Sequence, residues 1–78
     1  MRIKVYGTES CPQCHGAKQY LTKRGLSFEY VDVSKDTLAM KELEELEAMS
    51  IPVIKCGNTT IIGFNIKKLE EVINNGND

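Results

Sequence analysis

Apolar and polar residues alternate at the start of the chain. Ile3 and Val5 are separated by charged residues, and β-forming residues dominate residues 2–6. A period of two with this composition predicts a β-strand. Residues 7–10 then interrupt the pattern, so we expect a loop before the next element.

A helical pattern follows this loop. Pro12 suits the first helical turn, because no backbone N–H is needed there, so we expect the helix to begin at Cys11 or Pro12 and to end at Arg24. Gly25 can adopt the left-handed conformation that often ends a helix. The buried face is expected to contain Ala17, Tyr20 and Leu21.

The next two elements are a second strand and a second helix. Residues 28–33 are rich in aromatic and β-branched residues, and because a helix precedes them their strand should lie parallel to the first. A helix capped by Ser34 or Asp36 is then predicted to continue through Met49. On it we expect a buried stripe of Ala39, Leu43 and Leu46 and a solvated face of Glu42, Glu44, Glu45 and Glu47.

The last third of the chain predicts a hairpin and a final helix. Residues 52–56 and 59–62 form two short strands around the turn at residues 57–58, and Asn65 can cap a helix over residues 66–75. This last helix should bury Leu69, Val72 and Ile73. The order β-α-β-α-β-β-α predicts an α/β fold, a four-stranded mixed sheet with helices on both faces.

Length, composition and charge indicate one small folded unit. The 78 residues, 41% hydrophobic and 27% charged, fit a single domain over residues 1–75 with a frayed tail at 76–78. The net charge of −1 gives no attraction to nucleic acid. We find neither a membrane-spanning stretch nor the apolar segment of a signal peptide, and therefore expect a cytoplasmic monomer that binds no membrane.

The cysteines carry the chemistry. Of the three cysteines, Cys11 and Cys14 form a C-x-x-C pair at the predicted start of the first helix, where free N–H groups and the helix dipole stabilise a thiolate. We expect Cys11 to attack a disulfide. Cys14, one turn further on and more buried, should resolve the mixed disulfide that results. The sequence therefore predicts a thiol–disulfide oxidoreductase.

Other interpretations of these residues remain open. With His15 the run reads C-x-x-C-H, as in c-type haem attachment, and Cys11, Cys14, Cys56 and His15 together could in principle bind zinc. A redox-sensing or metal-carrying interaction module is the rival from another class. We favour no metal, an exposed His15, with an electrostatic effect on Cys11 left open, and a Cys56 packed as a small hydrophobic residue.

Several segments match a known family over nearly the whole chain. They are Met1-Arg2-Ile3, Val5-Tyr6, Cys11-Pro12-Gln13-Cys14-His15-Gly16-Ala17-Lys18, Arg24-Gly25, Phe28-Glu29, Ile51-Pro52-Val53 and Gly63-Phe64. On these the chain resembles the glutaredoxin-like branch of the thioredoxin superfamily. It is most similar to the NrdH-redoxins, which supply electrons to ribonucleotide reductase.

The resemblance implies a thioredoxin-like fold with catalytic cysteines Cys11 and Cys14 and a cis Ile51-Pro52 bond beside them. The backbone of Ile51 would then bind an extended substrate by strand addition. The substrate-binding residues implied are Pro12, Gln13, Ile51, Pro52, Gly63 and Phe64. No bound cofactor is implied, and the partner would be a disulfide-containing protein, with ribonucleotide reductase as one candidate.

Two external reductants are compatible with the resemblance. Glutathione-using relatives often have a lysine before the first cysteine and an aromatic residue between the two, whereas this chain has Thr8-Glu9 and Gln13. The usual NrdH-redoxin run Trp-Ser-Gly-Phe-Arg-Pro-Asp is here Ile61-Ile62-Gly63-Phe64-Asn65-Ile66-Lys67. We expect NADPH-linked thioredoxin reductase to recharge the protein, with a glutathione-dependent glutaredoxin as the alternative.

Overall fold

The computed structural model describes residues 2–75, which form four strands and three helices in the predicted order. The elements are β1 (Ile3–Gly7), α1 (Pro12–Lys23), β2 (Glu29–Asp32), α2 (Thr37–Glu45), β3 (Val53–Cys56), β4 (Thr59–Ile62) and α3 (Ile66–Asn75). The expected tail at residues 76–78 lies outside the described residues.

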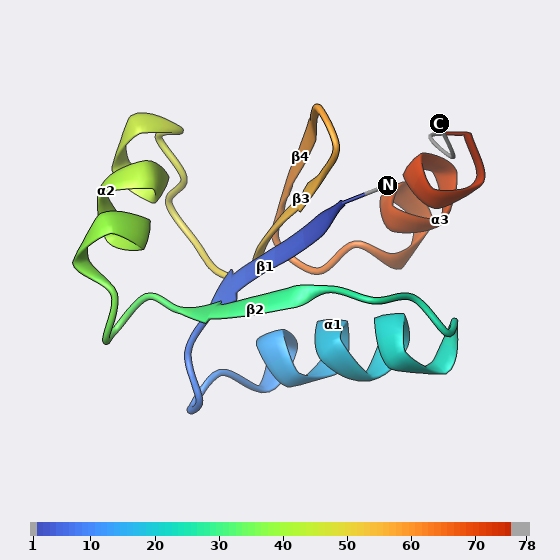
Figure 1. Ribbon diagram of the computed structural model, residues 1–78, viewed down its shortest axis with the longest axis horizontal. Coiled ribbons are helices and arrows are strands. Elements are labelled where there is room, and N and C mark those ends of the chain that lie inside the picture. The colour runs from blue at the N-terminus through green and yellow to red at the C-terminus, as the bar shows by residue number, and fades with distance from the viewer. Residues whose placement is uncertain (1, 76–78) are drawn as a thin grey trace.

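The strands form one mixed sheet in the order β2-β1-β3-β4 (Figure 1). β1 pairs parallel with β2 and antiparallel with β3, and β3 pairs antiparallel with β4. In this register Val5 lies opposite Tyr30 on β2 and Ile54 on β3. The mixed sheet predicted from the strand–helix–strand unit and the hairpin is therefore confirmed.

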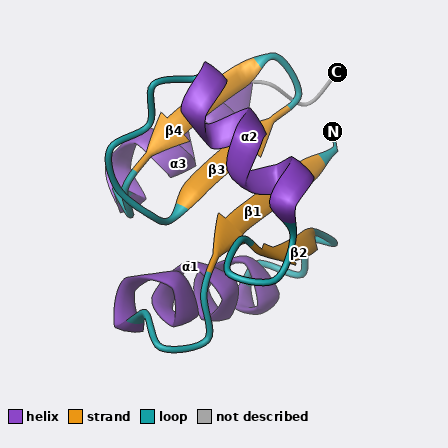
Figure 2. Cartoon of the chain, turned by 90° about the vertical axis from the view of Figure 1, so that its left-hand side faces the viewer, coloured by secondary structure: helices purple, strands orange, loops and turns teal. Residues whose placement is uncertain are grey.

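Two hydrophobic clusters cover the two faces of the sheet. The cluster on the side of α1 and α3 consists of Ile3, Val5, Ala17, Leu21, Ile54, Cys56, Ile61 and Leu69. The cluster on the side of α2 consists of Tyr6, Val31, Val33, Ala39, Leu43 and Val53. Figure 2, viewed from the α2 side, shows α2 in front of the sheet. Alternate residues of β1 enter opposite clusters, as the period of two predicts.

Helices α1 and α2 end with the same arrangement of backbone hydrogen bonds. In α1 the Leu26 N–H donates to the Leu21 carbonyl, and in α2 the Ala48 N–H donates to the Leu43 carbonyl. Each end needs one residue with a left-handed backbone. That residue is Gly25 in α1, with φ 70°, and Glu47 in α2, with φ 56°.

The prediction that α2 continues through Met49 was wrong. The helix ends at Glu45, because the left-handed Glu47 turns the chain away from the helical path. As a result Met49 is 95% exposed, and Leu46, expected in the buried stripe, is 38% exposed. Asp36 is the N-cap, its side chain accepting a hydrogen bond from the Ala39 N–H at 3.1 Å.

Glu42 was also placed wrongly by the helical pattern. It is half-buried, and its Oε2 accepts a hydrogen bond of 2.9 Å from the hydroxyl of Tyr6 on β1. The Lys4 ammonium lies 3.9 Å from the other carboxylate oxygen of Glu42. The remaining glutamates of the predicted solvated face are exposed, namely Glu44, Glu45 and Glu47.

The turn of the hairpin and the bounds of the last helix follow the prediction, but β3 begins at Val53 rather than Pro52, and Val72 and Ile73 are half-buried whereas Leu69 is fully buried. Gly57 takes a left-handed conformation at the turn between β3 and β4, and the Asn65 side chain accepts a hydrogen bond from the Lys68 N–H at 3.1 Å at the start of α3. Within residues 2–75, no helix combines the length and the apolar character needed to cross a bilayer.

Candidate active site

Cys11 caps the N-terminus of α1. It has an extended backbone, Pro12 follows it in the first turn, and the Cys11 Sγ accepts a hydrogen bond of 3.2 Å from the Cys14 N–H. The side chain is partly exposed. The predicted position of Cys11 is therefore confirmed: its sulfur lies where backbone N–H groups and the helix dipole favour a negative charge.

Cys14 lies one turn further along α1 and is fully buried. Burial first, and then the neighbouring Cys11 side chain, raise the pKa of the Cys14 thiol to about 11. A methyl group built on Gly7 would lie 2.6 Å from the Cys14 Sγ, so β1 leaves this sulfur just enough room by placing a glycine there. The pair thus consists of one partly exposed sulfur and one enclosed thiol, and this difference in burial is the one that the sequence predicts.

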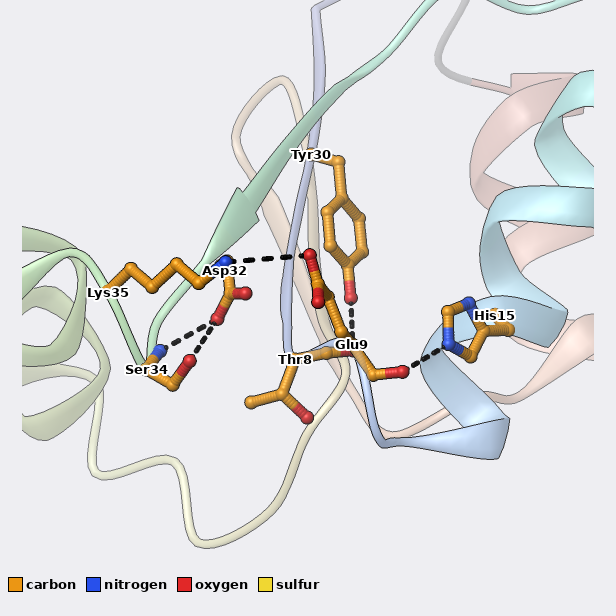
Figure 3. Close-up of polar contacts among 7 residues, drawn as sticks. All are labelled: Thr8, Glu9, His15, Tyr30, Asp32, Ser34 and Lys35. Atoms are coloured by element: carbon orange, nitrogen blue, oxygen red, sulfur yellow. Dashed lines mark hydrogen bonds and ion pairs between the residues drawn. The ribbon is translucent and has the colours of Figure 1, made fainter.

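Tyr30 on β2 adjoins the pair and was not singled out in the sequence. Its hydroxyl donates a 2.7 Å hydrogen bond to the Thr8 carbonyl (Figure 3). The Lys18 ammonium lies 4.2 Å from the centre of the Tyr30 ring. Burial, followed by the nearby Cys14, raises the pKa of Tyr30 to about 12. Strand alternation was the available signal, since Tyr30 lies on the opposite face from its neighbour Val31.

The loop that precedes Cys11 is held from two sides. The His15 ring bonds to the Glu9 carbonyl through Nε2, while Tyr30 holds the adjacent Thr8 carbonyl (Figure 3). Lys35 adds an ion pair of 3.6 Å to the Glu9 carboxylate. His15 is half-buried rather than exposed as expected, because its ring lies against this loop. The two carbonyl contacts fix the backbone directly before the cysteine pair.

The Ile51-Pro52 bond is cis, as the resemblance implied. Val53, the next residue, pairs with Tyr6, which precedes Gly7 at the end of β1 beside Cys14. The cis bond therefore lies at the same end of the sheet as the cysteine pair, where β1 ends and β3 begins. Within the described residues, the Ile51 N–H and C=O have no hydrogen-bond partner.

Gly63 contacts the cis-proline loop, and Phe64 contacts α1. The Gly63 N–H donates a 2.7 Å hydrogen bond to the Pro52 carbonyl, and Gly63 has φ 90°, a conformation that favours glycine. The Phe64 ring lies against Gly16, where an added methyl group would be 3.1 Å from a ring carbon. The structure thus brings Pro52, Gly63 and Phe64 to one side of the cysteine pair.

Pro12 and Gln13 lie in the exposed first turn of α1. All the residues expected at the site therefore lie on three neighbouring segments: the start of α1, the cis-proline loop, and the link from β4 to α3. Their substrate-binding role remains a prediction.

Cys56 lies apart from this site. It pairs with Ile3, at the opposite end of β1 from Gly7, and is 3% exposed within the cluster on the α1 and α3 side. Four residues of strand separate the two ends by about 13 Å, so Cys56 cannot complete a zinc site with Cys11 and Cys14. Burial raises the pKa of the Cys56 thiol. Among residues 2–75, no three His, Cys, Asp or Glu side chains are grouped as a metal site requires.

Comparison with known proteins gives one consistent family. The glutaredoxin family model matches residues 3–61. A glutaredoxin-like 8.6 kDa protein in the rubredoxin operon of Clostridium pasteurianum is 37% identical over 91% of this chain and 96% of that protein. The glutaredoxin-like protein NrdH of Escherichia coli K12 is 33% identical over 82% of this chain and 79% of its own length.

The solved structures agree. The NrdH-redoxin of Escherichia coli, described as a glutaredoxin-like protein with a thioredoxin-like activity profile, superposes with a TM-score of 0.87. It is 29% identical, and the match covers 92% of this chain and 95% of that one. The four-stranded mixed sheet with its three helices is therefore the thioredoxin-like fold.

Proposed function

The chain belongs to the glutaredoxin family and is a thiol–disulfide oxidoreductase, and we propose that it reduces disulfides of other proteins with Cys11 and Cys14. The observation that carries this proposal is the hydrogen bond from the Cys14 N–H to the Cys11 sulfur at the start of α1. It places an accessible sulfur at a helix N-terminus and a second, buried thiol one turn away.

The proposed reaction has two steps. The Cys11 thiolate attacks one sulfur of a substrate disulfide, forming a mixed disulfide and releasing one substrate thiolate. Cys14 then attacks the Cys11 sulfur, forming the Cys11–Cys14 disulfide and releasing the second substrate thiol. Two electrons pass to the substrate. The buried Cys14 is kept from competing for the first attack, because its pKa of about 11 leaves it protonated at neutral pH.

Substrate binding is proposed to use the backbone of Ile51. Its N–H and C=O have no partner within the described residues and lie just before β3, at the end of the sheet where β1 leads into the loop before Cys11. An extended substrate segment can pair with them as a strand, which presents its disulfide to the Cys11 sulfur. Pro12 and Gln13 would flank that segment on one side, and Gly63 and Phe64 on the other.

For the source of electrons we propose NADPH-linked thioredoxin reductase, and for the oxidised partner a ribonucleotide reductase. The support is similarity to the NrdH proteins, one of which is described as having a thioredoxin-like activity profile. Glutaredoxins work with external reductants rather than a bound cofactor. A dithiol donor of this kind is proposed to act in the cytoplasm, where thiols are kept reduced.

The first experiment tests the site. Reduction of a small disulfide is measured for the wild type, Cys11→Ser and Cys14→Ser, with Cys56→Ser as the matched control on a cysteine outside the site. We expect Cys11→Ser to lose turnover, Cys14→Ser to accumulate the mixed disulfide, and Cys56→Ser to remain within about twofold of wild type. Equal activity in all four proteins would contradict the proposal, and equal inactivity would favour a redox-sensing module.

The second experiment compares reductants. The oxidised protein is supplied with NADPH and thioredoxin reductase in one assay, and with NADPH, glutathione and glutathione reductase in the other. We expect NADPH consumption to be at least about tenfold faster in the first. Faster consumption in the second would identify a glutathione-dependent glutaredoxin.

A further inference from the structure

The Tyr30 hydroxyl and the Cys14 sulfur converge on Gly7. A methyl group built on Gly7 would lie 2.7 Å from the Tyr30 oxygen and 2.6 Å from the Cys14 Sγ, so both atoms border the same small space beneath the cysteine pair. Tyr30 comes from β2 and Cys14 from α1, so this approach depends on the tertiary fold. The mechanism above makes no use of the Tyr30 hydroxyl.

The hydroxyl has two acceptors within reach. In the structure it donates to the Thr8 carbonyl at 2.7 Å, and the Cys14 sulfur borders the same space at Gly7. Burial is the main cause that raises the pKa of the Cys14 thiol, whereas the Thr8 backbone and the Tyr30 side chain act in the opposite direction. A neutral thiol competes poorly with a carbonyl for this proton. A thiolate competes well, because hydrogen bonds to charged acceptors are stronger.

Lys18 strengthens Tyr30 as a donor. Its ammonium lies 4.2 Å from the centre of the Tyr30 ring, on the same helix as Cys14. A cation over the ring draws electron density from the phenol and makes its O–H more acidic. The ionisable groups facing this space are Cys11, Cys14 and Lys18 from α1 and Tyr30 and Asp32 from β2.

We propose that the Tyr30 hydroxyl is a catalytic hydrogen-bond donor to the Cys14 sulfur during the resolving step. This proposal rests on the proposed roles of Cys11 and Cys14. As Cys14 loses its proton, the Tyr30 O–H turns from the Thr8 carbonyl to the developing thiolate. Cys14 then attacks the Cys11 sulfur, the Cys11–substrate S–S bond breaks, and the departing substrate sulfur takes up one proton, so that charge and atoms balance.

The two steps can be followed separately with 5,5′-dithiobis(2-nitrobenzoate). Attack by Cys11 releases one coloured thiolate, and resolution by Cys14 releases the second, so stopped-flow absorbance gives a rate for each step. The experiment compares wild type and Tyr30→Phe between pH 6 and 10. Tyr20→Phe is the matched control, because that hydroxyl accepts a hydrogen bond from Arg24 at the exposed far end of α1.

We expect the hydroxyl to increase the thiolate fraction of Cys14 about tenfold, since a hydrogen bond to a charged group is typically that strong. A less basic sulfur is also a weaker nucleophile, which cancels about two thirds of this gain. Tyr30→Phe should therefore slow the second phase about threefold at pH 7 and displace its pH profile upward by about one unit. The first phase should stay within twofold, and Tyr20→Phe should change neither phase.

The outcomes of this experiment distinguish failure of the proposed function from failure of the role of Tyr30. If wild type shows no second phase that Cys14→Ser removes, the proposed function fails. If wild type shows both phases and Tyr30→Phe matches Tyr20→Phe in the second, only the role of Tyr30 fails. Lys18→Met keeps the hydroxyl and should displace the profile upward by a smaller amount. If Tyr30→Phe does not fold, Lys18→Met is the deciding variant. An unchanged pH profile of its second phase then overturns the proposal.

Discussion

Tyr6 and Tyr30 lie on adjacent strands and on opposite faces of the same sheet. On the α2 face, Tyr6 is fully buried and its hydroxyl donates to the Glu42 carboxylate at 2.9 Å. On the α1 face, the Tyr30 hydroxyl donates to the Thr8 carbonyl beside Cys14. Both rings fill a core, but only one polar group borders a reactive sulfur.

The comparison shows that one face of the sheet has a structural role, whereas the other also borders the reactive cysteines. The Tyr6 hydroxyl is paired with a carboxylate from α2, which ties that helix to the sheet. The Tyr30 hydroxyl is held by a backbone carbonyl, a weaker acceptor that it can leave when a charge appears on Cys14. We therefore expect changes on the α2 face to alter stability, and changes on the α1 face to alter stability and reactivity together.

The largest expected effect compares the leucines of the two faces. Leu21→Ala removes a fully buried side chain from the cluster on the α1 and α3 side, and should lower the free energy of unfolding by about 3–5 kcal/mol. Leu43→Ala, on the α2 side where the side chain is 5% exposed, should cost about 2–3 kcal/mol. Urea denaturation measures both. A larger loss for Leu43→Ala would show that the α2 face is the better packed.

A second test concerns the space between Cys14 and Tyr30. Gly7→Ala places a methyl group 2.6 Å from the Cys14 sulfur, and should lower the free energy of unfolding by about 1–3 kcal/mol. It should also slow the resolving step, because Cys14 must move. Gly16→Ala is the control, since its nearest contact is an edge of the Phe64 ring at 3.1 Å, and should cost less. Equal stability of Gly7→Ala and wild type would mean that this space is not tight.

Alkaline pH gives a third test. The pKa of Tyr30 is about 12 in the folded protein, against an ordinary value near 10, so above pH 10 the unfolded chain binds fewer protons than the folded one. This contribution to stability is complete below pH 10 and is lost as the pH rises to about 12. Burial and the Glu42 hydrogen bond also raise the pKa of Tyr6, with the same sign.

We therefore expect the free energy of unfolding to fall above pH 10, and to fall less steeply in Tyr30→Phe and in Tyr6→Phe than in wild type. Guanidinium titrations between pH 8 and 11 measure the slopes. Parallel slopes in all three proteins would show that neither phenol is stabilised in its neutral form by the fold.

The smallest effects concern the ends of α1 and α2. Glu47→Gly should raise the free energy of unfolding by about 1 kcal/mol, because glycine adopts the left-handed backbone without steric cost. Gly25→Ala should lower it by about the same amount, and an added methyl group there would meet nothing within 4 Å, so only the backbone is tested. Thermal unfolding checks the pair, and a loss of stability in Glu47→Gly would contradict the expectation.

The sequence predicted the placement of the cysteine pair well, because local rules apply there. Pro12 marks the first turn of α1, so the spacing of Cys11 and Cys14 already fixed which sulfur caps the helix and which is enclosed. The cis bond before Pro52 came from the resemblance, because local rules favour trans.

The failures involve positions where local rules and the fold disagree. Glu47 adopts a backbone conformation that favours glycine, so no residue signalled the end of α2. Glu42 is half-buried because its carboxylate accepts a hydrogen bond from Tyr6, which lies 36 positions away in the chain. A helical pattern contains no information about such a partner. Strand alternation places Tyr30 on the face opposite Val31, but it contains no information that Cys14 of α1 packs beside the Tyr30 hydroxyl.

Within residues 2–75 the Ile51 N–H and C=O have no hydrogen-bond partner, and the substrate binding proposed for them has a consequence for the choice of partners. Main-chain groups are the same in every polypeptide, so a client held through them is recognised by its extended shape rather than by its amino acids. Under this proposal one donor can serve several oxidised proteins, and we expect discrimination among them to depend on exposed side chains such as Gln13.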